Sequence, residues 1–390
     1  MSEAIGARGV DKKDIDQRED LRKKLFYQAF FKSKRWVCLF RPFKPCGNGL
    51  SSKKKQNVFS IMRLLTGIKP TGALHLGNYV GAIRPALSLL SDTANEAFLF
   101  VADGHALTSV TEGAALKQMT YEVAAAWMAA GLDVDRVVFY RQSQIPEVFM
   151  LFWILSCLTP KGLMNRAHAY KAIVQPRLEK NEDDIDRDVF MGLYNYPILM
   201  TADIVLFSAQ KVPVGPDQKQ HVEIARDLAI KFNQTYGDVL QVPQPAIQKE
   251  APSLAGLDGR KMSKSYHNVI PLFADDATLR KLIFKIKTTS QRPEEPKDPK
   301  TCNLFQLFAA FATADEKADI SKLYASGIGW AQMKETTFDV VERTVAPMRQ
   351  RYKALMQDIP LIEQKLKAGE ERARLEAKTL MNKICHAIGF

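Results

Sequence analysis

The sequence predicts an α/β protein, with a parallel sheet flanked by helices and an almost wholly helical C-terminal region. Three observations support this class. From residue 61 onward, short apolar stretches alternate with helical patterns, the order typical of strand–helix–strand units. From Asp275 to the end, the pattern is almost continuously helical. Hydrophobic residues make up 46% of the chain and charged residues 25%, which excludes a wholly disordered or collagenous protein.

Three apolar stretches are expected to be strands, and each precedes a helical pattern. The expected strands span residues 61–66, 97–102 and 136–140. The helices that follow them are expected over 77–90, 114–131 and 147–157. Farther along, residues 195–207 are apolar and a helix is expected over 219–232. Parallel strands joined by such helices place their carboxyl ends at one edge of the sheet.

The C-terminal region is expected to be helical with one polar, proline-rich loop over residues 293–299. The last helix carries apolar residues on one face, and Gly389 follows it: Ala373, Ala377, Leu380, Ile384 and Ile388. Together with the patterns above, this predicts three parts. They are an N-terminal extension (1–61), an α/β domain (62–270) and a helical domain (271–390).

The net charge of +12 is concentrated at the N-terminus. Residues 1–61 hold 15 lysines and arginines against 6 aspartates and glutamates. The remaining chain is nearly balanced, so its charge is weak evidence for nucleic-acid binding. We expect residues 1–61 to be disordered or to precede a native start at Met62. A mitochondrial leader is the alternative, but the acidic residues between Asp11 and Asp20 count against it.

Cysteine usage and hydropathy restrict the compartment. The five cysteines form no C-x-x-C pair, which argues against a disulfide framework or a structural zinc site. The longest apolar run, residues 148–158, is too short for a membrane span of about 20 residues. We therefore expect a cytoplasmic protein without a membrane association; the mitochondrial matrix stays the alternative if residues 1–61 are a leader.

A glycine-rich turn follows the first expected strand and leads into the first helix. It reads Gly67-Ile-Lys-Pro-Thr-Gly-Ala-Leu-His-Leu-Gly-Asn78. Gly72 permits a sharp turn, Pro70 fixes a bend, and Gly77 lets a flat ligand approach the backbone. Helix N-terminal amides attract phosphate, so this turn indicates a nucleotide site. On glycine content alone, an ordinary loop is the stronger interpretation.

A second motif lies much later in the chain and reads Gly259-Arg-Lys-Met-Ser-Lys-Ser-Tyr266. Lys261 and Lys264 can close on a polyphosphate, and the serines add hydroxyl donors. Two lysines at this spacing are in general a solvated basic loop. Together with His75-Leu-Gly-Asn78, however, this string closely resembles the paired signatures of class I aminoacyl-tRNA synthetases.

Two further stretches distinguish between members of that class. They read Tyr196-Pro-Ile-Leu-Met-Thr-Ala-Asp-Ile204 and Val212-Pro-Val-Gly-Pro-Asp-Gln-Lys-Gln-His221. They resemble the amino-acid pocket and the adjoining nucleotide loop of tryptophanyl-tRNA synthetases of the bacterial and organellar type. The resemblance covers residues 62–390. It implies a Rossmann-like catalytic domain with a helical insertion over 62–270, and over 271–390 a helical domain that binds the tRNA anticodon and ends in the C-terminal helix.

The resemblance also implies a reaction and its partners. Tryptophan and ATP give tryptophanyl-adenylate, and the acyl group then passes to the 3′ end of tRNA(Trp). ATP enters as a substrate together with Mg²⁺, and the protein is expected to be a homodimer.

The site residues carried over from the family fall into three groups. The catalytic residues are expected to be His75, Asn78, Lys261 and Lys264. The ATP-binding residues are expected to be Lys69, Pro70, Thr71, Gly77, Asn78, Gly215, Pro216, Asp217, Pro252, Lys261, Met262, Ser263, Lys264 and Ser265. The tryptophan-binding residues are expected to be Tyr196, Met200, Asp203 and Gln218, with the Asp203 carboxylate accepting the indole N–H.

Three positions depart from the family pattern. Lys69 stands where the family often has Gln, and Pro216 stands where a residue with a backbone N–H is common. His267 stands where Asp often follows the lysine loop. Each is expected to change ATP affinity without removing a group that the reaction needs. His105 flanks the pocket in the family, but a structural histidine at a strand end explains it equally well.

Three other functions stay open at this point. A tyrosyl-tRNA synthetase would have a similar fold. An adenylyltransferase that acts without tRNA shares the first motif, but the complete lysine loop and the helical tail argue against it. A non-enzymatic RNA-binding paralogue is expected to have lost Lys264 or Asn78, and both are present.

Overall fold

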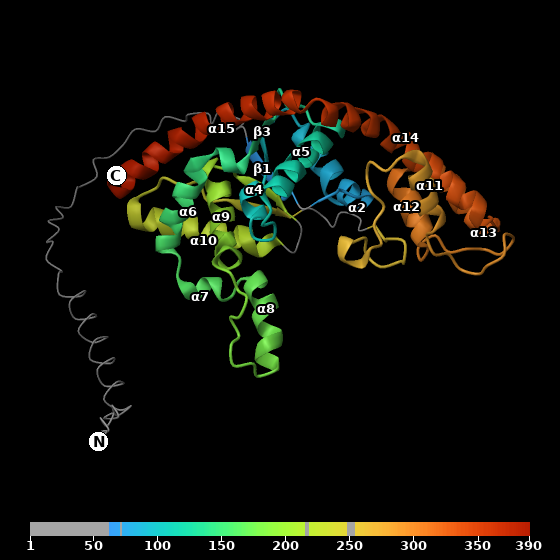
Figure 1. Cartoon of the computed structure of the whole chain (residues 1–390), viewed down its shortest axis with the longest axis horizontal. Helices are drawn as coiled ribbons and strands as arrows, with labels where there is room; N and C mark the ends of the chain where they lie inside the picture. Colours follow the sequence, from blue (N-terminus) through green and yellow to red (C-terminus); the bar gives the residue numbers. More distant parts are fainter. Residues whose placement is uncertain (1–61, 71, 215–217, 248–253) are drawn as a thin grey trace, which may run out of the picture. The chain divides into compact units, whose positions relative to one another are not determined.

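One parallel sheet organises the protein, seen here in a computed structural model that describes residues 62–70, 72–214, 218–247 and 254–390 (Figure 1). Its strands lie in the order β3-β2-β1-β4-β5. They span Met62–Ile68 (β1), Asn95–Val101 (β2), Val138–Arg141 (β3), Lys211–Val214 (β4) and Gln244–Ile247 (β5). The predicted α/β class is confirmed.

The strand order reverses beside β1. The chain moves outward from β1 to β2 and the edge strand β3, and then returns to place β4 on the other side of β1. At such a reversal, the loops leaving two neighbouring strands diverge and leave a crevice at the carboxyl ends. The glycine-rich turn leaves β1 at this crevice, and β4 ends at Val214 on its other side.

Helices cover both faces of the sheet, because the strand side chains alternate between two hydrophobic cores. On β2, Ala97 and Leu99 belong to the first core, and Phe98 and Phe100 belong to the second. The first core is packed by α2 (Leu76–Asn78), η1 (Tyr79–Ile83), α3 (Arg84–Leu90), α5 (Gly113–Ala129), α11 (Asp276–Phe284), α12 (Asn303–Phe311), α13 (Ala314–Ser326) and α14 (Trp330–Gln357). The second core is packed by α6 (Pro146–Leu158), α7 (Lys161–Met164), α9 (Met191–Leu206) and α10 (Lys219–Tyr236).

The last helix, α15 (Ile359–Ile388), contributes to both cores. Its first turns place Ile362 and Leu366 in the first core, and its later turns place Ala373 and Ala377 in the second. Between them the helix passes the edge strand β3 (Figure 1). The predicted apolar face of this helix is confirmed by the burial of Ala373, Ala377, Leu380 and Ile384.

The remaining short elements are α4 (Asp103–Ala106), α8 (His168–Glu179) and the 3-10 turns η2 (Gln142–Gln144) and η4 (Lys264–Tyr266). The sequence patterns did not predict β4 and β5. Each has four residues with a proline among them, and proline removes a ladder donor and argues against a strand. The expected helix over 77–90 is present, but residues 79–83 form a π-helical turn.

The three-part division at residues 61 and 270 stays a prediction, and residues 1–61 lie outside the described part. Within the described ranges, every helix is too short or too polar to cross a bilayer.

Candidate active site

The first nucleotide loop is held in shape by its own side chains. His75 caps the N-terminus of α2, where its Nδ1 accepts a hydrogen bond from the backbone N–H of Asn78 at 3.3 Å. The Asn78 Oδ1 accepts one from the backbone N–H of His75 at 3.0 Å. This reciprocal capping box satisfies two helix-terminal donors. Gly72 turns the chain ahead of it with φ of 80°, a conformation that favours glycine.

His75 is neutral at physiological pH. Only 7% of its surface is exposed, and burial together with the charge of Lys264 lowers its pKa to about 4. Since Nδ1 accepts a hydrogen bond, the ring proton resides on Nε2. The ring can therefore donate one hydrogen bond from Nε2 without carrying charge.

This lowered pKa makes stability depend on pH. The unfolded chain binds a proton at His75 below about pH 6.5, whereas the folded chain does so only near pH 4. The contribution of His75 to stability is therefore complete above pH 6.5 and is lost as the pH falls toward 4. Between pH 7 and pH 5, we expect the wild type to lose about 2 kcal/mol more unfolding free energy than His75→Asn. Denaturant titrations of both proteins measure this, and parallel losses would contradict the lowered pKa.

The structure brings the lysine loop against the first nucleotide loop. The segment that follows the lysine loop exchanges backbone hydrogen bonds of 2.9 Å with the first nucleotide loop, from Leu76 N to the Ile270 carbonyl and from Leu272 N to the Leu74 carbonyl. A side chain at Gly77 would touch both His75 Nδ1 and Met262 Cβ, at 3.0 and 3.5 Å. The Lys264 Nζ lies 3.6 Å from the place that a Cβ on Gly72 would take. The two motifs, distant in sequence, thus form one site.

Asn268 fixes the backbone of the lysine loop by hydrogen bonds, and the sequence did not predict this role. It is 2% exposed, its Oδ1 accepts from the Ser263 N–H at 2.8 Å, and its Nδ2 donates to Asp258 at 2.7 Å. The same Nδ2 donates to the Lys261 carbonyl at 3.2 Å. The hydrogen bonds from Asn268 and Arg260 lower the pKa of Asp258 to about 2. The signal available in the sequence was an asparagine two residues after the motif, next to the apolar residues Val269 and Ile270.

A buried carboxylate lies at the centre of the second candidate subsite. Asp203, on α9, is 1% exposed. Its oxygens accept from Gln142 Nε2 at 2.9 and 2.8 Å, and Oδ2 also accepts from His105 Nε2 at 2.9 Å. Burial raises the pKa of Asp203, and the hydrogen bonds from His105 and Gln142 oppose this. His105 is thus a direct hydrogen-bond partner of the Asp203 carboxylate.

A second polar chain runs beside this carboxylate. The Tyr196 hydroxyl lies 2.7 Å from His221 Nε2, and His221 Nδ1 lies 2.7 Å from Gln218 Oε1. Gln218 Oε1 can only accept, so His221 carries its proton on Nδ1 and accepts from the tyrosine. The Tyr196 ring meets the His105 ring edge-on, with centroids 6.2 Å apart. Met200 is partly buried against the second core on the same helix. The four predicted tryptophan-binding residues therefore come from α9 and the start of α10.

Lys69 connects the two subsites. Its Nζ donates to the Thr108 hydroxyl at 2.9 Å, and that hydroxyl donates to the His105 carbonyl at 2.8 Å. Burial lowers the pKa of Lys69. The positive charge at this position is thus directed toward the Asp203 subsite.

The other predicted ATP-binding residues are placed as follows. Pro70 is buried, Met262 is in the first core, Ser263 is half-buried, and Lys261 and Ser265 are exposed. His267 ends the 3-10 turn after Lys264 in the left-handed region, with φ of 51°. Five predicted residues lie outside the described part of the chain: Thr71, Gly215, Pro216, Asp217 and Pro252. Among the described residues, no group of three or more His, Cys, Asp or Glu is placed to hold a metal ion.

Comparisons with known proteins agree with this arrangement. The family described as tRNA synthetases class I (W and Y) matches residues 60–346. A tryptophan–tRNA ligase of Neisseria meningitidis is 49% identical over 328 residues, which cover 84% of this chain and 98% of that protein. A tryptophan–tRNA ligase of Xanthomonas campestris is 49% identical over 84% of this chain and 76% of that protein.

A solved structure gives the same result. The tryptophanyl-tRNA synthetase of Campylobacter jejuni, in complex with ADP and tryptophan, has a TM-score of 0.76 and 38% identity to this chain. The match covers 84% of this chain and all of that one. Matches of this extent and identity, on a fold with the two nucleotide motifs joined at the sheet reversal, place the chain in the class I aminoacyl-tRNA synthetases, as a member of the tryptophanyl-tRNA synthetase family.

Proposed function

We propose that this protein is a tryptophan–tRNA ligase that activates L-tryptophan with ATP and transfers it to tRNA(Trp). The observation that carries the proposal is the pairing of a buried carboxylate, Asp203, with the joined nucleotide loops at the reversal of the sheet. Family membership supports the same reaction. The relatives named above are tryptophan–tRNA ligases, so the alternative of a tyrosyl-tRNA synthetase is not favoured.

In the first step, an oxygen of the tryptophan carboxylate attacks the α-phosphorus of ATP. A new O–P bond forms, the bond to the β-phosphate oxygen breaks, and pyrophosphate leaves with its electron pair. The nucleophile is already ionised, so the reaction needs no general base. Catalysis then consists of positioning and of stabilising charge on the phosphates.

The residues of the two motifs are proposed to divide this work. Gly77 and Asn78 support the adenosine, and the neutral His75 donates from Nε2 to phosphate. Lys261 and Lys264 neutralise the departing pyrophosphate, as their charge and the position of the Lys264 ammonium beside the Gly72 turn support. The remaining ATP contacts are proposed to come from Lys69, Pro70, Thr71, Gly215, Pro216, Asp217, Pro252, Met262, Ser263 and Ser265. Mg²⁺ is proposed to enter with ATP and to neutralise phosphate charge.

Selection of tryptophan is proposed to rest on Asp203. Gln142 and His105 fix the orientation of its carboxylate, and carboxylate oxygens retain capacity for a further donor such as the indole N–H. Tyr196, Met200 and Gln218 are proposed to complete the pocket. In the second step, a 3′-terminal hydroxyl of tRNA(Trp) attacks the activated acyl carbon and AMP leaves, and the helical region from residue 271 is proposed to hold the anticodon arm.

The functional unit is proposed to be a homodimer in the cytoplasm. The helix α6 buries Val148, Leu151 and Leu155 but exposes Trp153 at 68% and Met150 at 41%. Together with Phe149, these side chains give α6 an exposed apolar face of the kind that a second copy covers. The three cysteines in the described part of the chain, Cys157, Cys302 and Cys385, are free thiols, which supports a reducing compartment.

This face yields a prediction. Trp153→Glu is expected to convert the dimer into a monomer, because a charge would have to be buried without a partner. Light scattering at low micromolar concentration measures the mass. Leu375→Glu serves as the control. It places the same charge at an exposed apolar residue of α15, and this variant is expected to stay dimeric. A wild-type monomer, or a dimer that survives Trp153→Glu, would contradict the assignment of α6.

The function itself is tested by aminoacylation. Transcripts of tRNA(Trp) and tRNA(Tyr) are offered separately with labelled tryptophan and labelled tyrosine. We expect label on tRNA(Trp) with tryptophan only. Label on tRNA(Tyr) with tyrosine would support the tyrosyl alternative, and adenylate formation without any tRNA product would support the adenylyltransferase.

A further inference from the structure

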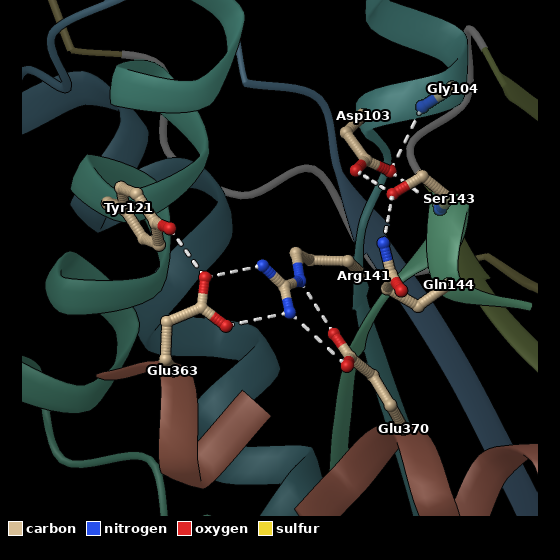
Figure 2. A network of polar contacts seen from close by, with 8 residues as sticks. All are labelled: Asp103, Gly104, Tyr121, Arg141, Ser143, Gln144, Glu363 and Glu370. Atoms are coloured by element: carbon tan, nitrogen blue, oxygen red, sulfur yellow. Dashed lines mark hydrogen bonds and ion pairs between the residues drawn. The ribbon is translucent and has the colours of Figure 1, made fainter. Parts of the chain in front are cut away.

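A polar network joins the edge strand to the C-terminal helix, at a place that the reaction above does not use (Figure 2). Arg141, the last residue of β3, donates to two glutamates of α15. Its Nη1 and Nη2 reach the Glu363 oxygens at 2.7 and 2.9 Å, and its Nε and Nη2 reach the Glu370 oxygens at 2.6 and 3.2 Å. The Tyr121 hydroxyl of α5 donates to Glu363 as well. One guanidinium thus holds two carboxylates in bidentate pairs, the most directional ion-pair geometry.

Both ends of this network are fixed. Glu363 and Glu370 are seven residues apart and therefore lie on one face of the helix. Burial opposes both charged forms, yet hydrogen bonds from Arg141 and Tyr121 lower the pKa of Glu363, and the hydrogen bonds to Glu370 and Glu363 raise the pKa of Arg141. Gly369 lies between the two glutamates, and a Cβ on it would overlap the Phe139 carbonyl of β3 at 1.8 Å. The helix therefore rests directly on the strand backbone where α15 passes from one core to the other.

The residue after Arg141 reaches into the candidate active site, and the next one is tied to α4. Gln142 is fully buried, and its Nε2 donates to both oxygens of Asp203 while its Oε1 accepts from the His105 backbone N–H at 3.1 Å. Ser143 donates to Asp103 from its backbone N–H at 2.9 Å and from its hydroxyl. Three consecutive residues are thus tied to the C-terminal helix (Arg141), to the Asp203 carboxylate (Gln142) and to the first residue of α4, Asp103 (Ser143). A shift of Arg141 along β3 would be transmitted to Gln142 without an intervening flexible side chain.

From this arrangement we infer that Arg141, clamped by Glu363 and Glu370, is a positioning residue: it fixes the Gln142–Asp203 hydrogen bonds and thereby the affinity for the amino-acid substrate. The inference rests on the proposed function, since Asp203 is the proposed tryptophan contact. It makes the C-terminal helix a structural part of the amino-acid pocket.

The test removes the network without leaving an unpaired charge. The variant Arg141→Met/Glu363→Gln/Glu370→Gln replaces all three charged groups by neutral ones of similar size. The variant Arg141→Lys keeps the positive charge but cannot form the two bidentate pairs. The matched control is Arg372→Met. Arg372 also ties α15 to the β3 region, through the Asp135 and Arg136 carbonyls at 3.0 and 2.9 Å, but at the opposite end of the strand.

Pyrophosphate exchange gives KM for each substrate, and hydrogen–deuterium exchange follows the backbone amides of residues 143–145. We expect the triple variant to raise KM for tryptophan at least fivefold, with KM for ATP within twofold, and to exchange these amides at least tenfold faster. Arg141→Lys should lie between it and the wild type, and Arg372→Met should leave both readouts within twofold.

Equal increases in KM for tryptophan and ATP in the triple variant, or the same changes in Arg372→Met, would overturn the inference. Arg141 would then stabilise the fold in general and would not position Gln142. If the wild type gave no tryptophan-dependent exchange, the proposed function would fail instead, and deuterium exchange would still decide whether Arg141 fixes the turn after β3. If the triple variant does not fold, Arg141→Lys decides by the same two readouts.

Discussion

Replacing Asp203 with asparagine is expected to lower kcat/KM for tryptophan at least tenfold. It is also expected to narrow the difference in kcat/KM between tryptophan and phenylalanine. The buried carboxylate accepts from Gln142 and His105, and both partners present N–H groups to it. An asparagine at this position must direct its own NH₂ toward a donor or toward the indole N–H. An unsatisfied buried polar group costs about 1–3 kcal/mol, and more when a charge is involved. Since about 1.4 kcal/mol corresponds to a factor of ten, the expected loss follows.

The phenylalanine comparison isolates the role of the acceptor. Phenylalanine has no N–H to lose, so its already low kcat/KM should change less than that of tryptophan. Glu316→Gln is the control, because it also removes a hydrogen-bonded carboxylate, paired with Arg343, but in α13. Unchanged discrimination in Asp203→Asn would move the specificity role to Met200, Gln218 or Tyr196.

Lys264→Ala is expected to slow adenylate formation about a hundredfold while changing tryptophan affinity only slightly. Negative charge on the departing pyrophosphate is largest in the transition state, so a group that meets it there acts mainly on the rate. Removing one such contact has an effect on the order of 3 kcal/mol. The position of the ammonium beside the Gly72 turn supports this role.

Single-turnover quench-flow measures the rate of adenylate formation, and titration calorimetry measures tryptophan binding. Lys322→Ala removes an exposed lysine that pairs with Asp319 and is expected to behave as the wild type. A normal single-turnover rate combined with a collapse of tryptophan affinity would show that Lys264 belongs to the amino-acid pocket instead.

Local patterns in the sequence predict those parts of the fold that depend on periodicity. The strands β1 to β3 follow from short continuous apolar runs, and the helices after them and the buried face of α15 follow from repeats of about 3.6 residues. By contrast, β4 and β5 are four residues each with an internal proline, and they become strands only because a neighbouring strand supplies the pairing. Tertiary context overrides propensity at such short elements.

The candidate site divides in the same way. Motifs identify Lys261, Lys264, His75 and Asn78, because each motif is local in sequence. The partners that orient them are distant, and no local pattern indicates that Gln142 will meet Asp203, 61 residues away. The clamp on Arg141 is more remote still, since its glutamates lie 222 and 229 residues farther along the chain. Such contacts depend on the path of α15 over the sheet, which is a property of the packed cores.

The central claim, that this chain activates tryptophan with ATP, is tested most directly by exchange of labelled pyrophosphate into ATP with each of the twenty amino acids in turn. The joined nucleotide loops and the Asp203 pocket predict exchange with tryptophan, and at most a trace with tyrosine or phenylalanine. Exchange that depends on tyrosine, or no exchange with any amino acid from a folded protein, would contradict the assignment.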